Sequence, residues 1–198
     1  MTPAMIKTIL PALALPALAF AAAAAPSAAL AGQVINVPHF NSIALHGGGE
    51  ATLRYGDRQR VVLIKGDPAI AEIRVKDDGM LLLSPCRHTC WGNHELEVEI
   101  TTPSVSELSV HGGGDLRADR GFPRQPRLAL SVHGGGDANL RALPADNVSV
   151  EVHGGGDAQV RAERSLAAEV HGGGEVRFWG HPQVSSKTYG GGSVESGE

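Results

Sequence analysis

Five copies of a motif, one histidine followed by three glycines and an acidic residue, carry the side chains best suited to chemistry. A sixth, degenerate copy has Tyr189 in place of the histidine and Ser193 in place of the acid. Imidazole and carboxylate groups are ligands for zinc, copper or nickel, and glycine runs can offer backbone N–H groups to an anion. The motif therefore raises metal binding and anion stabilisation as candidate chemistries. The five copies are His46–Glu50, His111–Asp115, His133–Asp137, His153–Asp157 and His171–Glu175.

Three known uses of glycine-rich motifs do not fit this chain. An oxyanion loop of the lipase type works with a Gly-x-Ser-x-Gly nucleophile elbow, and the sequence has none. A phosphate-binding P-loop needs a Lys-Ser/Thr pair directly after its glycines and a helix behind it. The calcium-binding nonapeptide Gly-Gly-x-Gly-x-Asp has a period about half as long and a spacer before its acid. The glycines are therefore better explained by the backbone they permit.

The spacing of the motif indicates the architecture that positions it. From the second copy onward, the motifs begin 22, 20, 18 and 18 residues apart. Before each histidine the residues alternate, so that Leu108 and Val110 face a core while Ser109 and His111 face outward. Strand, glycine corner and strand at this period predict an all-β chain, a single parallel β-helix with coils of roughly 20 residues. A β-sandwich is the alternative, but its hairpins would not place every copy of the motif at the same position of successive turns.

The N-terminal part of this expected fold is less regular. His46 and His111 are 65 residues apart, which is about three coils at the same period. Two of those coils would lack the glycine motif. We therefore expect residues 32–106 to form irregular coils and residues 107–198 to form regular ones.

Residues 1–31 have the composition of a secretory signal. Lys7 is the only charged residue before Glu50, and an apolar run ends in Ala29-Leu30-Ala31, an A-x-A cleavage site. The expected mature chain is a single domain, 32–198, in the periplasm, the outer cell envelope or the medium. It would have no stable membrane insertion after cleavage, and an uncleaved membrane anchor is the alternative.

Charge and composition exclude some partners. The net formal charge of the chain is −4, whereas a nucleic-acid or anionic-membrane surface needs a basic patch. Aromatic residues make up 4% of the sequence and there are 26 glycines. This composition favours many short strands and turns over a helical bundle.

The two cysteines, Cys86 and Cys90, lie close together in the sequence. In an exported chain such a pair is expected to form a disulfide, which closes a short loop. Because His88 and His94 flank the same loop, a zinc site is the alternative. Free thiols are a third reading.

Stacked coils would arrange the outward residues of the motif in two columns. Like charges about 4.8 Å apart repel, so the acids need partners, and imidazoles or a bound zinc or copper ion would serve. The structural alternative is a glycine corner whose histidines hydrogen-bond to aspartate or water. In that reading no cofactor is needed, but serine would serve the turn equally well, so the choice of histidine is unexplained. The candidate metal ligands are His111, His133, His153, His171, Asp115, Asp137, Asp157 and Glu175.

Several segments resemble a known family. The entry Phe40-Asn41-Ser42-Ile43, the later glycine and aspartate corners, and the closing Phe178–Pro182 are similar to the putative auto-transporter adhesin head GIN-domain family. That family usually has Ser-Gly-Ser-Gly-Asp at its corners, where this chain has His-Gly-Gly-Gly-Asp. The resemblance covers nearly all of residues 32–198. It implies a right-handed β-helix in an exported bacterial protein, and it brings no catalytic residues.

Three functions follow as hypotheses. The first is a non-enzymatic, exported cell-envelope module for structure, adhesion or binding, with a cell-surface protein or glycan as partner and possible homo-oligomers. The second is a divalent-metal-binding envelope protein that uses the histidine and acid columns. The third is a polysaccharide-acting enzyme, which would need acids clustered in a groove of long loops, whereas the connections here are short. No nucleic-acid partner is expected.

Overall fold

The computed structural model describes residues 32–87 and 94–197, and within these ranges the chain is built of β-strands. All fifteen strands belong to one sheet. No helix in the described ranges is long and apolar enough to cross a membrane. The all-β prediction is confirmed. The strands are β1 (Gln33–Ile35), β2 (Ser42–Gly47), β3 (Glu50–Tyr55), β4 (Arg60–Lys65), β5 (Glu72–Val75), β6 (Met80–Ser84), β7 (Glu97–Thr102), β8 (Glu107–Gly112), β9 (Asp115–Ala118), β10 (Gln125–Gly134), β11 (Asp137–Gly154), β12 (Ala158–Gly172), β13 (Glu175–Trp179), β14 (Gln183–Gly190) and β15 (Ser193–Ser196).

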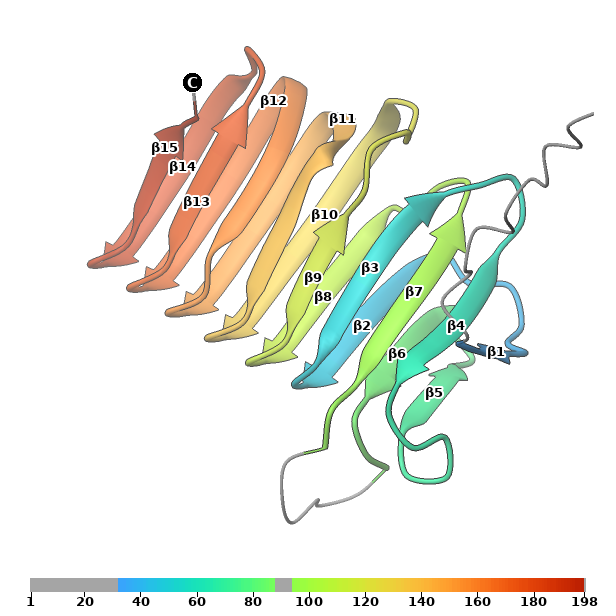
Figure 1. Ribbon diagram of the computed structural model, residues 1–198. Coiled ribbons are helices and arrows are strands. Elements are labelled where there is room, and N and C mark those ends of the chain that lie inside the picture. The colour runs from blue at the N-terminus through green and yellow to red at the C-terminus, as the bar shows by residue number, and fades with distance from the viewer. Residues whose placement is uncertain (1–31, 88–93, 198) are drawn as a thin grey trace, which may run out of the picture.

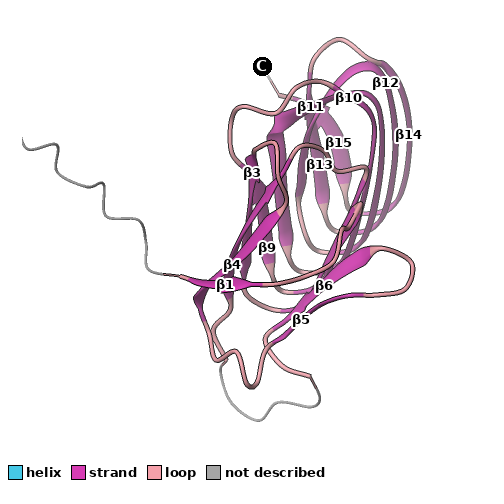
Figure 2. Ribbon diagram, turned by 90° about the vertical axis from the view of Figure 1, so that its right-hand side faces the viewer, coloured by secondary structure: helices cyan, strands magenta, loops and turns pink. Residues whose placement is uncertain are grey.

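The sheet curls back on itself into a nearly closed, barrel-like wall around the core (Figures 1 and 2). We call the strands that lead into the glycine corners, together with β6 and β5, which extend this side of the sheet beyond β2, wall A; they are β2, β8, β10, the second part of β11, the second part of β12, β14, β6 and β5. Wall B contains the strands that leave these corners, β3, β9, the first parts of β11 and β12, β13 and β15, together with β1, β4 and β7. The motif therefore marks one edge, at which the chain passes from wall A to wall B.

The prediction of a single right-handed parallel β-helix is wrong. The sheet is mixed, because β1 pairs with β4, β4 with β7, and β5 with β6 in antiparallel fashion. The physical reason is visible in the β5–β6 hairpin. Gly79 has a φ of +80°, and the Asp78 carboxylate accepts the Met80 N–H at 3.0 Å, so the chain reverses in a tight turn. The glycine motif occurs only at the corners between the walls, so it does not predict these hairpins.

The two motif-free coils expected between His46 and His111 are absent from the described chain. β2 pairs directly with β8 and β3 directly with β9, so that His46 lies opposite His111 and Glu50 opposite Asp115. The chain between these strands instead extends wall A through β6 and wall B through β7, on the outer side of β2 and β3. The long sequence separation thus reflects an excursion to the far end of the sheet.

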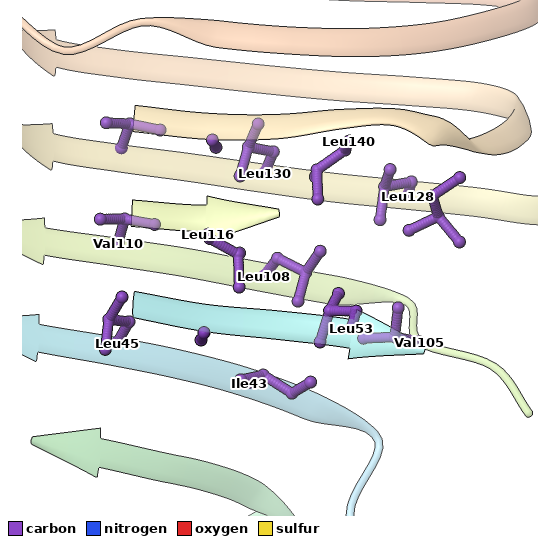
Figure 3. Packing of buried hydrophobic residues seen from close by; sticks show 14 of the residues in the cluster. Ile43, Leu45, Leu53, Val105, Leu108, Val110, Leu116, Leu128, Leu130 and Leu140 are labelled. Carbon is purple, nitrogen blue, oxygen red and sulfur yellow. The ribbon is translucent and has the colours of Figure 1, made fainter. Parts of the chain in front are cut away.

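The apolar side chains of the two walls meet in one continuous core. Its cluster runs from Phe40 to Val176 and includes residues from both halves of the chain. Figure 3 shows how Leu108 and Leu130 of wall A interleave with Leu53 and Leu116 of wall B. Parallel pairing keeps equivalent positions one above another, because Val110, Val132, Val152 and Val170 are register partners along the stack. The same register also aligns the side chains that face outward from equivalent positions of neighbouring strands.

Candidate functional site

The histidines of the five motifs form one continuous ladder with Tyr189 at its end. Neighbouring ring centroids are 4.6 to 4.8 Å apart at every step. The rings from His111 to His171 are parallel to within 4°, whereas His46 is tilted by 52° from His111. We call this set the imidazole ladder; its members are His46, His111, His133, His153, His171 and Tyr189.

Strand alternation and register together position the ladder. Each histidine of the ladder follows a buried residue, such as Val152 before His153, and points outward from wall A. The side chain two residues earlier lies on the same face and holds the ring. Ser131 lies 2.8 Å from His133, Glu151 lies 2.5 Å from His153, and the equivalent Glu169–His171 distance is 2.7 Å, all measured to Nε2.

Burial and charge change the acid–base properties of part of the ladder. Burial lowers the pKa of His46 below its ordinary value, and the charge of Lys76 lowers it further. Burial also lowers the pKa of His111, with further contributions from His46 and His133. These effects favour the neutral imidazole at this end of the ladder. The hydrogen bond from His153 lowers the pKa of Glu151, which favours its carboxylate form.

Close contact between the stacked backbones explains two of the three glycines in each corner. Gly134 has a φ of +119°, and an added Cβ would lie 2.6 Å from the Gly112 carbonyl oxygen. At Gly136 a Cβ would lie 2.3 Å from the Gly114 carbonyl oxygen and 2.8 Å from Val110. The middle glycine differs, because a Cβ on Gly135 would meet no atom within 4 Å. The stacked backbones thus require glycine on either side of an open position.

The acids form a second row on the other side of the corner, where each begins or precedes a strand of wall B. Asp137 accepts the backbone N–H of Asp157 at 3.1 Å, and Asp157 accepts that of Glu175 at 3.0 Å. Arginines supply further partners, since Arg117 lies 2.8 Å from Glu50 and Arg177 pairs with Glu175. The partners of this row are therefore backbone N–H groups and guanidinium groups. The acid row consists of Glu50, Asp115, Asp137, Asp157 and Glu175.

The ladder and the acid row are not brought together as a metal centre. In the described ranges no three histidine, cysteine, aspartate or glutamate side chains are grouped so that they could hold an ion. Parallel rings 4.7 to 4.8 Å apart also keep equivalent nitrogens about that far apart. Two zinc–nitrogen bonds of about 2.0 to 2.1 Å cannot bridge such a gap. Metal binding by this set stays a prediction that would require the rings to turn.

Only part of the cysteine loop belongs to the described chain. The Ser84 hydroxyl donates a hydrogen bond to the Cys86 carbonyl oxygen at 2.8 Å, just after β6. Cys90 and His88 lie outside the described residues, as does the predicted signal segment 1–31. The Cys86–Cys90 disulfide and its zinc alternative with His94 therefore stay predictions.

Two ladder residues and one member of the acid row, Glu50, were not among the predicted site residues. His46 and Tyr189 complete the ladder at its two ends. Both occupy the histidine position of a motif copy, so the phase of the repeat was the signal that could have found them. The arginine partners carried a weaker signal, because Arg117 and Arg177 both stand two residues after a motif acid. The other copies have Thr52, Asn139 and Gln159 at that position.

The class of protein defined by these observations is an all-β module with a regular outer face and with no group of metal ligands in the described ranges. The family described as putative auto-transporter adhesin, head GIN domain, matches residues 39–126 and 124–182. These matches span most of the sequence, so the chain belongs to this family, as the resemblance indicated. No curated protein matches the sequence.

Two solved structures have a similar fold. One is described as a putative adhesin from Bacteroides fragilis; it is 21% identical with a TM-score of 0.52, and the match covers 86% of this chain and 98% of that one. The other is described as a putative lipid binding protein from Parabacteroides distasonis. It is 16% identical with a TM-score of 0.50, and the match covers 84% of this chain and 96% of that one. At these identities the likeness concerns the fold alone.

Proposed function

We propose that the protein is a non-enzymatic binding module of adhesion type, which uses the imidazole ladder face of wall A to contact an extended glycan at the cell surface. The observation that carries the proposal is the ladder itself. Its rings repeat at nearly one spacing, and those from His111 to His171 are parallel to within 4°. Catalysis needs different groups that converge on one reacting atom, whereas a row of equivalent groups suits a ligand that itself repeats.

The surroundings of the ladder support a polar, ring-containing ligand. His153 and His171 are about one third exposed, at 36% and 37%, so their rings are accessible while their positions are held. Beside them lies a shallow hollow of about 230 Å³ that is lined by Ser149, Ala167 and Glu169, among others. Small side chains leave room for a ligand, and the carboxylates offer hydrogen-bond acceptors.

Protein docking has less support on this face. Protein interfaces concentrate their energy in buried aromatic and arginine anchors within an apolar centre. The exposed large apolar residues of the described ranges are scattered over the surface, and only Tyr189 of them belongs to the ladder. A glycan partner is consistent with the family description of an adhesin. Export, through the predicted signal segment, belongs to the same proposal.

A glycan array probed with the labelled protein tests this function. The His133→Ser plus His153→Ser variant removes two central rungs of the ladder, and we expect it to lose binding to any glycan that the unaltered protein retains. His39→Ser plus His181→Ser is the matched control, because both histidines are exposed and lie outside the ladder. Equal binding by all three proteins, or no bound glycan at all, would refute the proposal.

A further inference from the structure

Wall B carries a hollow that the ladder does not use. It has a volume of about 660 Å³ and lies where the chain leaves wall B at the edge opposite the glycine corners. The loop after β9 forms one side, and the middle of β11 together with one residue of β12 forms the other. Its charged and apolar lining includes Asp119, Arg120, Phe122, Arg141, Pro144 and Arg161.

Two local irregularities open this hollow in an otherwise regular wall. β9 ends at Ala118, and the chain then makes a loop around Gly121, whose φ is +118°. In β11, residues 140–143 lie opposite Val160 alone, so that strand bulges outward. Bulges re-aim side chains and occur often beside functional sites. The longer motif spacings of 22 and 20 residues contain these two segments, whereas the later spacings of 18 contain neither.

The arginines of the hollow are incompletely neutralised. Arg161 donates to Glu163 at 2.8 Å, and the lone carboxylate of the lining, Asp119, already accepts a hydrogen bond from Arg54 at 3.1 Å. Arg120 and Arg141 have no carboxylate within ion-pair distance among the residues that the structure describes. In a chain with a net charge of −4, this hollow concentrates positive charge.

Arg141 is also held in place by an aromatic ring. Its guanidinium carbon lies 4.4 Å from the centroid of the Trp179 ring. Such stacking leaves the edge of the guanidinium free to donate hydrogen bonds and lowers the entropy lost when a ligand binds. The hollow thus presents a donor fork that is oriented before any ligand arrives.

We propose that this hollow binds a phosphate group. Guanidinium forks match the oxygens of phosphate and carboxylate, but the lining carries three arginines against one aspartate. A carboxylate has one negative charge and is satisfied by one fork. A phosphate monoester carries about −1.5 to −2 charges and three acceptor oxygens, which suits several arginines around one hollow. The phosphate could belong to a lipid headgroup or to a free phosphate compound.

Trp179 reports binding at this site through its fluorescence. Trp91 is the other tryptophan of the sequence, so the titration uses the Trp91→Phe background. Inorganic phosphate is added at constant ionic strength, and we expect a saturable change in emission. Arg120→Gln plus Arg141→Gln should weaken the apparent affinity by at least about tenfold, since a hydrogen bond to a charged group is worth roughly that factor or more.

Arg127→Gln plus Arg164→Gln is the matched control, because it removes the same two charges from exposed side chains that do not line the hollow. Its affinity should stay within about twofold of the unaltered protein. Arg120→Lys plus Arg141→Lys keeps the charge but loses the forks, and an intermediate affinity is expected. Circular dichroism of each variant checks that the fold is retained.

Flotation with lipid vesicles distinguishes the two phosphate sources. Vesicles of phosphatidylcholine with phosphatidic acid are compared with vesicles of phosphatidylcholine alone. Arginine-dependent flotation with phosphatidic acid assigns the site to a lipid headgroup, and a response to inorganic phosphate alone assigns it to a soluble compound. If neither probe binds, or if Arg120→Gln plus Arg141→Gln binds both as well as the unaltered protein does, the proposal is overturned.

Discussion

Alanine substitutions along one glycine corner should have very different effects on stability. At Gly136 the added Cβ would lie 2.3 Å from a backbone oxygen of the preceding level and 2.8 Å from Val110. Overpacking of this kind costs about 1 to 3 kcal/mol. At Gly134 the backbone φ of +119° adds strain of about 1 to 2 kcal/mol for any residue with a Cβ. We therefore expect Gly134→Ala and Gly136→Ala each to lower the free energy of unfolding by at least about 2 kcal/mol.

The neighbouring Gly135→Ala is the internal control. Its Cβ would meet no atom within 4 Å, and its φ lies outside the positive range. Alanine at such a position reduces the entropy of the unfolded chain, which is worth about 0.4 to 1 kcal/mol in favour of folding. Gly135→Ala should therefore be neutral or slightly stabilising. The three variants differ by the same single methyl group, so the comparison isolates backbone geometry.

Thermal unfolding followed by circular dichroism measures the difference. In a domain of this size, about 1 kcal/mol corresponds to about 2 to 4 °C in Tm. Gly134→Ala and Gly136→Ala should therefore melt at least about 4 °C below the unaltered protein, while Gly135→Ala should melt at or above it. If Gly135→Ala were as destabilising as Gly136→Ala, the close stacking of the corners would be refuted.

Three further outcomes are expected. Leu116 is 1% exposed, so Leu116→Ala should lower the free energy of unfolding by about 2 to 5 kcal/mol in urea denaturation; a loss below about 1 kcal/mol would contradict its place in the core. The pKa values of His46 and His111 are lower in the folded chain than their ordinary value of 6.5. Below about pH 6.5 the unfolded chain therefore binds more protons than the folded chain, so Tm should fall as the pH is lowered from 7.5 to 5.5. The fall should be less steep when both residues are replaced by serine. A Tm that does not change over this pH range would contradict the lowered pKa values. Because the parallel rings would have to turn before two of them could share a zinc ion, calorimetric titration with Zn²⁺ should show no sub-micromolar site; binding that disappears in His133→Ser plus His153→Ser would instead establish the metal hypothesis.

The parts of the fold that the sequence predicts are those that the motif encodes locally. Alternation before each histidine predicts that Leu108 and Val110 face the core, and both are buried. The glycine corners predict a change of direction, which the passage from wall A to wall B provides. These features depend on a few adjacent residues, so a single sequence is sufficient to read them.

The rest depends on which strands pair, and the motif does not specify pairing. A separation of 65 residues between His46 and His111 fits three coils as well as one long excursion. The antiparallel hairpins of the N-terminal part produce the long excursion rather than three coils. The glycine motif does not predict that the chain reverses direction in these hairpins. The arginine hollow was missed for a related reason. Whole-chain charge argued against a basic surface, whereas a loop and a bulge collect arginines in one place.

The corner also shows which of its residues are free to change. Family corners usually read Ser-Gly-Ser-Gly-Asp, and the two glycines they share with this chain correspond to the positions of Gly134 and Gly136, where stacked backbones exclude a Cβ. The two serines correspond to the outward ring of His133 and to the open position of Gly135. This chain and the family pattern therefore differ only in side chains that the corner displays. A substitution at these two displayed positions would change the surface along one edge while the frame beneath stays constant, and the new residue type would recur at the strand spacing.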